Sequence, residues 1–167
     1  MAASGDTRAT VYLGLGSNIS PEENLRLAIM ELRARYGDLD LSAVYQSAAV
    51  GFEGADFLNL VVRLRSEESA LEICDRIELI HNLAGRKSDK WESRQLDIDL
   101  LLYNDLVSEE RPVRVPRHDV LDYSFVLRPL AELAPDLIHP VTGKTILQHW
   151  QKFNAASQPL EIIDVVL

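Results

Sequence analysis

The spacing of hydrophobic and polar residues switches along the chain between a period of two and a period near 3.6, which predicts both strands and helices. Strands are predicted at residues 10–16, 39–46, 57–64, 94–103 and 160–167. Helices are predicted at residues 20–36, from Ser66 or Ser69 to Ile80, at 123–133 and at 146–153. Leu106 and Val107 are expected to begin a return strand after a turn at Asn104 and Asp105.

The start of the first predicted helix has a recognisable local signal. Ser20 supplies a hydroxyl for the N-cap, Pro21 suits the first turn, and Glu23 occupies the position of a capping-box glutamate. We therefore expect the Ser20 side chain to cap this helix.

The order of the predicted elements is strand, helix, strand, strand, helix, strand, followed by two helices and a last strand. This order is typical of the ferredoxin-like, split β-α-β arrangement, an α+β fold whose mostly antiparallel sheet has its helices on one face. The other face would then be open to a substrate, with the strand at residues 94–103 central or nearly so. We expect a single domain over residues 1–167, with residues 1–9 as a disordered leader.

Charge and cysteine content exclude several classes of protein. The formal net charge of −9 argues against a nucleic-acid or anionic-membrane partner, because both require a broad basic surface. The single cysteine, Cys74, is expected in the core and fits a reducing, cytoplasmic location. Neither a signal peptide nor an apolar run of about 20 residues is evident, so no membrane span is expected.

Two aspartates interrupt an otherwise apolar predicted strand. Asp97 and Asp99 fall on one face of this strand, while Leu96, Ile98 and Leu100 fall on the other. Two unscreened carboxylates about 6 Å apart repel by roughly 3 kcal/mol at an effective dielectric near 20, so a counter-charge is expected. Magnesium fits if phosphates share it, and the pair is also within reach of two metal ions. The alternative is a pair of solvated acids on the open face of an edge strand.

Other candidate residues are individually weak. The Gly14–Asn18 segment has neither the lysine of a P-loop nor the third glycine of a dinucleotide fingerprint, so it predicts a tight turn. Phe57 and Asn59 share a strand face, where a ring and an amide can bind a flat heterocycle; a core aromatic and a turn asparagine are the alternative. The next two groups are candidate anion contacts. These are the basic segment with Arg86, Lys87, Lys90 and Arg94, and the set Arg117, His118 and Arg128.

Taken together, these motifs resemble one known family, 6-hydroxymethyl-7,8-dihydropterin pyrophosphokinase. The matching motifs are Leu15-Gly16-Ser17-Asn18, Phe57-Leu58-Asn59, Gly85-Arg86, Leu96-Asp97-Ile98-Asp99-Leu100-Leu101 and Phe125-Val126-Leu127-Arg128-Pro129-Leu130. The resemblance spans roughly residues 10–155 and implies a ferredoxin-like fold. It also implies transfer of pyrophosphate from ATP to a pterin alcohol in folate biosynthesis.

The resemblance further implies roles for individual residues. Asp97 and Asp99 match the family's ligands for two Mg²⁺ ions. Four residues match positions that contact the pterin: Ser47, Phe57, Asn59 and Phe125. Arg86 and Arg94 match catalytic basic residues that contact ATP, and four further residues are expected to bind ATP beside them: Lys87, Lys90, Arg117 and His118.

The chain also departs from the family's usual pattern. Ser88 replaces the second arginine of Gly-Arg-x-Arg, and Lys90-Trp91-Glu92-Ser93-Arg94 replaces Arg-Trp-Gly-Pro-Arg. Arg117 replaces the usual histidine after proline, and Tyr123 replaces an arginine. These changes call the phosphate contacts into question more than the fold.

Our hypothesis is a Mg²⁺-dependent, cytoplasmic pyrophosphokinase that acts as a monomer on ATP and a pterin, with no nucleic-acid or membrane partner. Two alternatives remain open. One is a non-catalytic or diverged relative that binds pterin or nucleotide, and the other is a metal-dependent phosphohydrolase that uses the same aspartates on water. The lack of a further carboxylate or histidine cluster argues against the phosphohydrolase.

Overall fold

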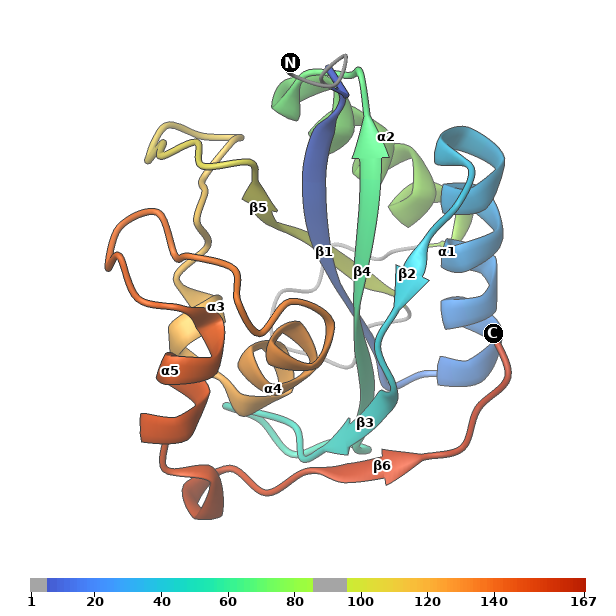
Figure 1. Ribbon diagram of the computed structural model, residues 1–167. Coiled ribbons are helices and arrows are strands. Elements are labelled where there is room, and N and C mark those ends of the chain that lie inside the picture. The colour runs from blue at the N-terminus through green and yellow to red at the C-terminus, as the bar shows by residue number, and fades with distance from the viewer. Residues whose placement is uncertain (1–5, 86–95) are drawn as a thin grey trace.

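The computed structural model describes residues 6–85 and 96–167 of the chain. In this part, one antiparallel sheet has the strand order β5-β1-β4-β3-β6, with β2 also paired to β4 (Figure 1). The strands are β1 (Ala9–Ser17), β2 (Asp40–Leu41), β3 (Val44–Ser47), β4 (Phe57–Ser66), β5 (Asp97–Tyr103) and β6 (Glu161–Ile163). The helices are α1 (Pro21–Tyr36), α2 (Ala70–Leu83), α3 (Asp119–Asp122), α4 (Ser124–Leu133) and α5 (Ile146–Lys152), with a 3₁₀ turn, η1, at Ala155–Ser157.

The topology confirms the ferredoxin-like, α+β prediction. Helix α1 connects β1 to β3, and β4 lies between these two strands; helix α2 connects β4 to β5, and β1 lies between them. Two interleaved split β-α-β units result. Strand β5 pairs only with β1, so it is an edge strand of the described sheet. The expectation that the aspartate strand is central was therefore wrong.

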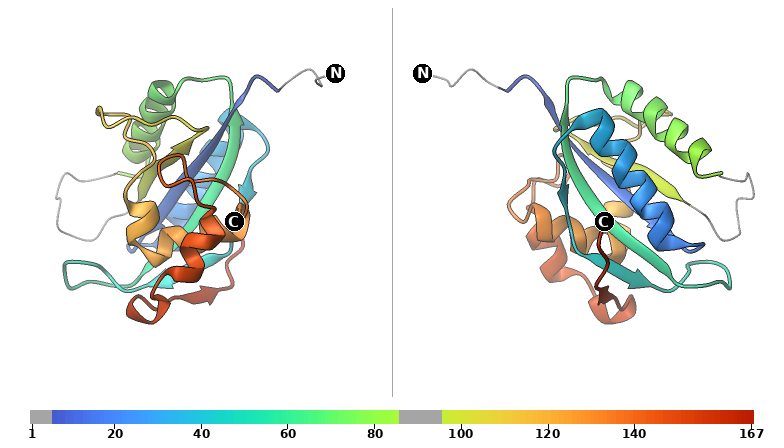
Figure 2. Two further views of the ribbon diagram at one scale, coloured as in Figure 1. Left: turned by 60° about the vertical axis from the view of Figure 1, so that its left-hand side comes forward. Right: turned by 90° about the vertical axis from the view of Figure 1, so that its right-hand side faces the viewer.

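Helices lie on both faces of the sheet, whereas the sequence predicted them on one face (Figure 2). Helices α1 and α2 cover one face, over a core that includes Leu13, Ile29 and Ile73. Helices α3, α4 and α5 lie on the other face, where Leu127 and other buried residues pack against Val61. Successive residues of β4 are buried in opposite cores, so the strand is buried continuously over residues 58–62 although Asn59 interrupts its apolar sequence.

The second helical layer also interrupts a predicted strand. Residues 39–46 form two short strands rather than one, because side chains replace part of the backbone pairing at Ser42 and Ala43; only the Ser42 N–H still donates to a β4 carbonyl, that of Val61, at 3.0 Å. The Ser42 hydroxyl accepts from the N–H of Val61 at 2.9 Å, and the N–H of Ala43 donates to Glu132 on α4 at 2.9 Å. A side-chain acceptor from α4 thus replaces a sheet partner.

The predicted Ser20 cap and the predicted strand at Leu106 and Val107 were wrong, and the structure decides between the two candidate caps of α2. Ser20 does not cap α1, because its φ of 42° is left-handed and its side chain makes no capping bond. Leu106 and Val107 form no strand; the segment has only an isolated bridge between Ser108 and Val115. Ser69, rather than Ser66, caps α2, with Glu72 completing a reciprocal capping box.

Two further predictions differ from the structure at the ends of the chain. Strand β6 covers only Glu161–Ile163 of the predicted residues 160–167. Part of the predicted disordered leader has defined contacts, because Asp6 pairs with Arg8 at 2.9 Å and with Arg65 at 3.0 Å, and β1 begins at Ala9. Within residues 6–85 and 96–167, no helix combines the length and apolar character needed to cross a bilayer.

Candidate functional site

A cavity of about 320 Å³ lies between the sheet and the α3–α4 layer. Its lining comes from β1, β3, β4, β5, the segment after β3, and α3 and α4. Six residues proposed from the sequence line it together: Ser47, Phe57, Asn59, Asp97, Asp99 and Phe125. The structure therefore gathers residues that are as far as 78 positions apart in the chain around one space.

The amide of Asn59 has a defined orientation at the cavity wall. Its Nδ2 donates to the backbone oxygen of Tyr45 at 3.1 Å and to the Ser47 hydroxyl at 2.8 Å. The Tyr45 carbonyl can only accept, which fixes the amide nitrogen on that side. The Oδ1 atom consequently faces Gly16 and the cavity, where it can accept a hydrogen bond from a ligand N–H.

Asn59 and Phe57 approach Gly16 so closely that the position has little room for a side chain. It pairs across the sheet with Asn59 on β4 and with Asp97 on β5. A Cβ atom at this position would lie 3.1 Å from Asn59 Oδ1 and 3.7 Å from Phe57 Cδ1. The glycine thus keeps the cavity open between the amide and the acids.

Aromatic rings form two walls of the cavity. Phe52 meets Phe57 edge to face, with ring centroids 6.3 Å apart and planes at 82°. Tyr123 stacks on Phe125 with centroids 5.0 Å apart and planes at 22°. Faces of this kind suit a flat, conjugated ligand.

The acidic end of the cavity is formed by β5 and α3. Asp97, Asp99 and Leu101 face the cavity, while Ile98 and Leu100 lie in the α1–α2 core, which confirms the predicted alternation. Asp119, at the start of α3, also lines this end.

Arg117 is the nearby counter-charge. Its Nη2 lies 3.6 Å from Asp99 Oδ1, and its Nε lies 3.3 Å from Asp119 Oδ2. Burial alone lowers the pKa of this guanidinium, but the carboxylates of Asp99 and Asp119 outweigh burial and raise it. Among the described residues, the buried Nε has no well-aligned hydrogen bond, so the contact with Asp119 pairs charges without satisfying the donor. The guanidinium can therefore gain from an additional anionic acceptor.

A second cavity of about 200 Å³ adjoins this acidic end at the outer edge of β5. Asp99 lines both cavities, and Arg117 lines the second one. The walls of the second cavity also include Ile77, Leu100, Pro112 and Cys74. Cys74 was expected in the core, but it is only half buried, its Sγ lies 3.8 Å from the Pro112 oxygen, and burial raises its pKa.

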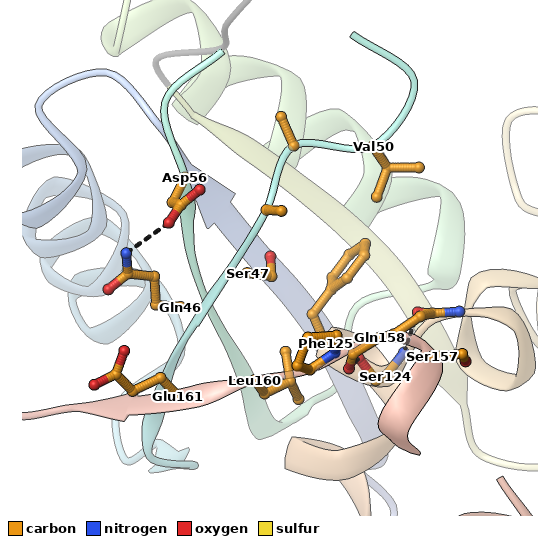
Figure 3. Close-up of a pocket in the computed structure, with 13 residues that line it drawn as sticks. Gln46, Ser47, Val50, Asp56, Ser124, Phe125, Ser157, Gln158, Leu160 and Glu161 are labelled. Carbon is orange, nitrogen blue, oxygen red and sulfur yellow. Dashed lines mark hydrogen bonds between the residues drawn. The ribbon is translucent and has the colours of Figure 1, made fainter. Parts of the chain in front are cut away.

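A third cavity, of about 420 Å³, opens beside the aromatic wall (Figure 3). It shares Ser47, Val50 and Phe125 with the first cavity and is closed by the segment after α5. There Ser124, the first residue of α4, donates from its N–H to Gln158 Oε1 at 2.9 Å and from its hydroxyl to the Gln158 oxygen at 2.8 Å. The C-terminal segment thus fixes the turn of α4 that presents Phe125.

The remaining candidates have different placements. His118 lines neither the first nor the second cavity, and its Nε2 lies 3.1 Å from Glu109. Arg128 lies over the Tyr45 ring, 5.0 Å from its centroid, instead of at the acids. The predicted basic residues Arg86, Lys87, Lys90 and Arg94 lie outside the described residues.

Two residues of the first cavity were not predicted as site residues: Asp119, and Tyr123, which stood out in the sequence only as a departure from the family's pattern. Asp119 follows Arg117 by two positions, and an acid so near a candidate anion contact could have indicated a site residue. The Tyr123 and Phe125 spacing was another signal, because two aromatic residues two positions apart straddle a helix start.

Comparisons with known proteins agree with this arrangement. The sequence model of the family described as 7,8-dihydro-6-hydroxymethylpterin-pyrophosphokinase (HPPK) matches residues 12–135. The 2-amino-4-hydroxy-6-hydroxymethyldihydropteridine pyrophosphokinase of Aquifex aeolicus is 36% identical over 141 residues, which cover 83% of this chain and 88% of that protein. The protein of the same name from Synechocystis sp. is 39% identical over 141 residues, covering 81% of this chain and 72% of that protein.

Solved structures show the same fold. An HPPK-DHPS structure in complex with substrates has a TM-score of 0.70 at 12% identity, covering 90% of this chain and 44% of that one. Plasmodium falciparum HPPK-DHPS with pterin and p-hydroxybenzoate has a TM-score of 0.70 at 15% identity, covering 92% and 44%. The present chain thus spans less than half of either solved chain. On the family match and the two curated relatives, the chain belongs to the 7,8-dihydro-6-hydroxymethylpterin-pyrophosphokinase family.

Proposed function

We propose that the protein transfers pyrophosphate from ATP to 6-hydroxymethyl-7,8-dihydropterin, a step of folate biosynthesis, and releases AMP. Family membership supports this reaction. The observation that carries it is a single cavity with an aromatic, amide-bearing end and an acidic end. A flat heterocycle at one end would hold its hydroxymethyl group toward phosphates at the other.

The pterin is proposed to lie between Phe57 and Phe125. Tyr123 stacks on the Phe125 ring, and Asn59 Oδ1 accepts from a ring N–H of the pterin. Ser47 is proposed to help in two ways. Its hydroxyl oxygen accepts from the amide of Asn59 and so orients that amide, and its hydroxyl proton is available to donate to the pterin.

Asp97 and Asp99 are proposed to hold two Mg²⁺ ions. Magnesium is commonly bound by one or two carboxylates together with substrate phosphates and waters, so this donor set fits it. In the described part of the chain, no group of three or more His, Cys, Asp or Glu side chains is arranged to hold a metal by itself, which agrees with a site completed by ATP. When bound, the ions would neutralise charge on the phosphates.

The nucleoside of ATP is proposed to occupy the cavity at the outer edge of β5. Ile77 and Leu100 offer apolar walls, and Arg117 stands between this cavity and the acids. Its under-satisfied guanidinium would turn from carboxylate to phosphate as ATP binds. Further phosphate contacts by Arg86, Lys87, Lys90, Arg94 and His118 are part of this proposal.

The chemical step needs positioning more than a reactive side chain. The hydroxymethyl oxygen forms a bond to the β-phosphorus of ATP. The bond between that phosphorus and the oxygen that bridges it to the α-phosphorus breaks. The electron pair leaves on AMP, and the hydroxyl proton passes to water. The aromatic walls and Asn59 set the direction of attack, and Arg117 offsets charge on the transferred group.

The test is product analysis with ATP and Mg²⁺, with and without the pterin alcohol. AMP release that depends on both the pterin and the metal supports the proposal. Pterin binding without ATP consumption would favour a non-catalytic relative, and ADP with phosphate would favour a phosphohydrolase. Removing the metal with EDTA should stop AMP release, and restoring Mg²⁺ should return it.

The nucleotide location has a separate test in the single cysteine. Cys74 lines the second cavity, so α,β-methylene-ATP with Mg²⁺ should slow its reaction with a thiol reagent. Inorganic pyrophosphate, which lacks the nucleoside, is the control and should slow the reaction of Cys74 with the reagent only slightly. Equal protection by both would contradict the assignment.

We also propose that the protein acts as a monomer in the cytoplasm. A single cysteine, which excludes an internal disulfide, fits a reducing compartment. Sedimentation at the protein concentration of the assay tests the monomer.

A further inference from the structure

A buried histidine on α2 contacts the strand that carries the two site aspartates. His81 is 2% exposed, and its Nε2 accepts a hydrogen bond from the backbone N–H of Ile98 at 2.9 Å. Ile98 lies between Asp97 and Asp99 in β5. A ring nitrogen that accepts is unprotonated, so the neutral ring carries its proton on Nδ1, 3.1 Å from Glu78 Oε1.

The register of the sheet explains why this N–H needs a side-chain acceptor. Ile98 lies opposite Leu15, with Asp97 and Asp99 opposite Gly16 and Gly14. In an antiparallel ladder, successive residues direct their peptide groups to opposite edges of the strand. The N–H of Ile98 therefore points away from β1, to the side on which no described strand pairs with β5. His81 supplies the acceptor that another strand would otherwise provide, and buried N–H groups are rarely left without one.

Helix α2 is a rigid support for this contact. The helix begins with the Ser69–Glu72 capping box, and Ile73, Ile77 and Ile80 anchor it in the core. His81 follows Ile77 by four positions and so shares the buried face of the helix. The ring is thus held in place from both its helix and its hydrogen-bond partner.

We propose that His81 is a positioning residue for the acidic end of the site. By holding the Ile98 amide, it fixes the backbone between Asp97 and Asp99, and with it the separation and direction of the two carboxylates. This inference rests on the proposed function. Partners that orient metal ligands commonly change metal affinity or activity by about 10- to 100-fold when they are removed.

The test compares three variants of the full chain. His81→Leu removes the acceptor, His81→Gln retains one in its side-chain oxygen, and Ile73→Val trims a buried residue elsewhere on α2 as a matched control. In calorimetry, Mg²⁺-dependent binding of α,β-methylene-ATP should weaken about tenfold in His81→Leu. The Gln variant should recover most of this loss, and Ile73→Val should bind like the unmodified protein.

Two further readouts separate positioning from general destabilisation. Hydrogen exchange of the Ile98 amide should accelerate in His81→Leu, while exchange of the Val62 amide in the core should not. The turnover number should fall without a change in KM for the pterin, since the aromatic end does not depend on His81.

Several outcomes would overturn the inference. Unchanged nucleotide binding and Ile98 exchange in His81→Leu would do so, as would an equal loss in Ile73→Val. If His81→Leu does not fold, the acceptor role is tested in the unmodified protein by ¹⁵N NMR of the His81 ring. A protonated Nε2 of His81 would refute that role. If the unmodified protein binds no analogue with Mg²⁺, the proposed function fails, and Ile98 exchange alone judges the role of His81.

Discussion

Adding one methyl group at Gly16 tests whether the Asn59 amide recognises the substrate. The Cβ atom of Gly16→Ala would lie 3.1 Å from Asn59 Oδ1, closer than an ordinary contact. Asn59 is buried and its Nδ2 is held by Tyr45 and Ser47, so the amide can yield only by straining these bonds. The accepting oxygen would consequently be displaced from its position at the cavity.

The size of the effect follows from one misaligned hydrogen bond. A neutral hydrogen bond contributes about 0.5–1.5 kcal/mol net, which corresponds to roughly a two- to tenfold change in the dissociation constant. We therefore expect Gly16→Ala to weaken pterin binding by about fivefold. The KM for ATP should change little if Asp97, which also neighbours Gly16, keeps its position.

Gly14→Ala is the matched control on the same strand. Its Cβ would meet Leu101 Cδ2 at 3.4 Å, an ordinary van der Waals contact, so pterin binding should be unchanged. Fluorescence titration of both variants with the pterin alcohol, together with thermal unfolding, gives the comparison. Wild-type affinity in Gly16→Ala, or an equal loss in Gly14→Ala, would refute the reasoning.

Three other predictions concern the acids, a buried histidine and the helix starts. Asp97→Asn should lower AMP release at least about hundredfold with the melting temperature nearly unchanged; normal turnover would disprove its role. Burial lowers the pKa of His139 from its ordinary 6.5. The unfolded chain therefore takes up more protons as the pH falls below that value, and the free energy of unfolding should decrease. Denaturant titration at pH 7.5 and 5.5 should show a smaller decrease for His139→Asn. Ser69→Ala should cost about 1 kcal/mol in unfolding free energy, whereas Ser20→Ala, which removes no cap, should cost under about 0.5 kcal/mol; equal losses would contradict the capping assignment.

Local pattern was enough to predict most of the secondary structure. Apolar spacing placed α1, α2 and β4 within a few residues of their observed bounds. It did not foresee that Ser20 adopts a left-handed conformation, since a serine before proline and glutamates has the composition of a cap whatever its backbone does. Nor did it separate β2 from β3, because the break depends on Glu132, 89 positions away from Ala43.

The candidate site was predictable where residues share one short segment. The common face of Asp97 and Asp99 follows from the period of a strand alone. The pairing of Phe57 with Asn59 on one strand has the same origin. By contrast, the contacts of Arg117 with Asp99 and Asp119 depend on how the chain after β5 returns to the sheet, which no local pattern describes.

The sequence by itself determined the order of strands and helices and the faces of β5, because these depend on side-chain periodicity over fewer than about ten residues. Tertiary structure alone decided that β5 is an edge strand, that α4 covers the second face of the sheet, and that His81 meets the Ile98 amide. Such contacts join segments far apart in the chain. Their geometry is set by the packing of both cores together, so it exists only once the whole sheet has formed.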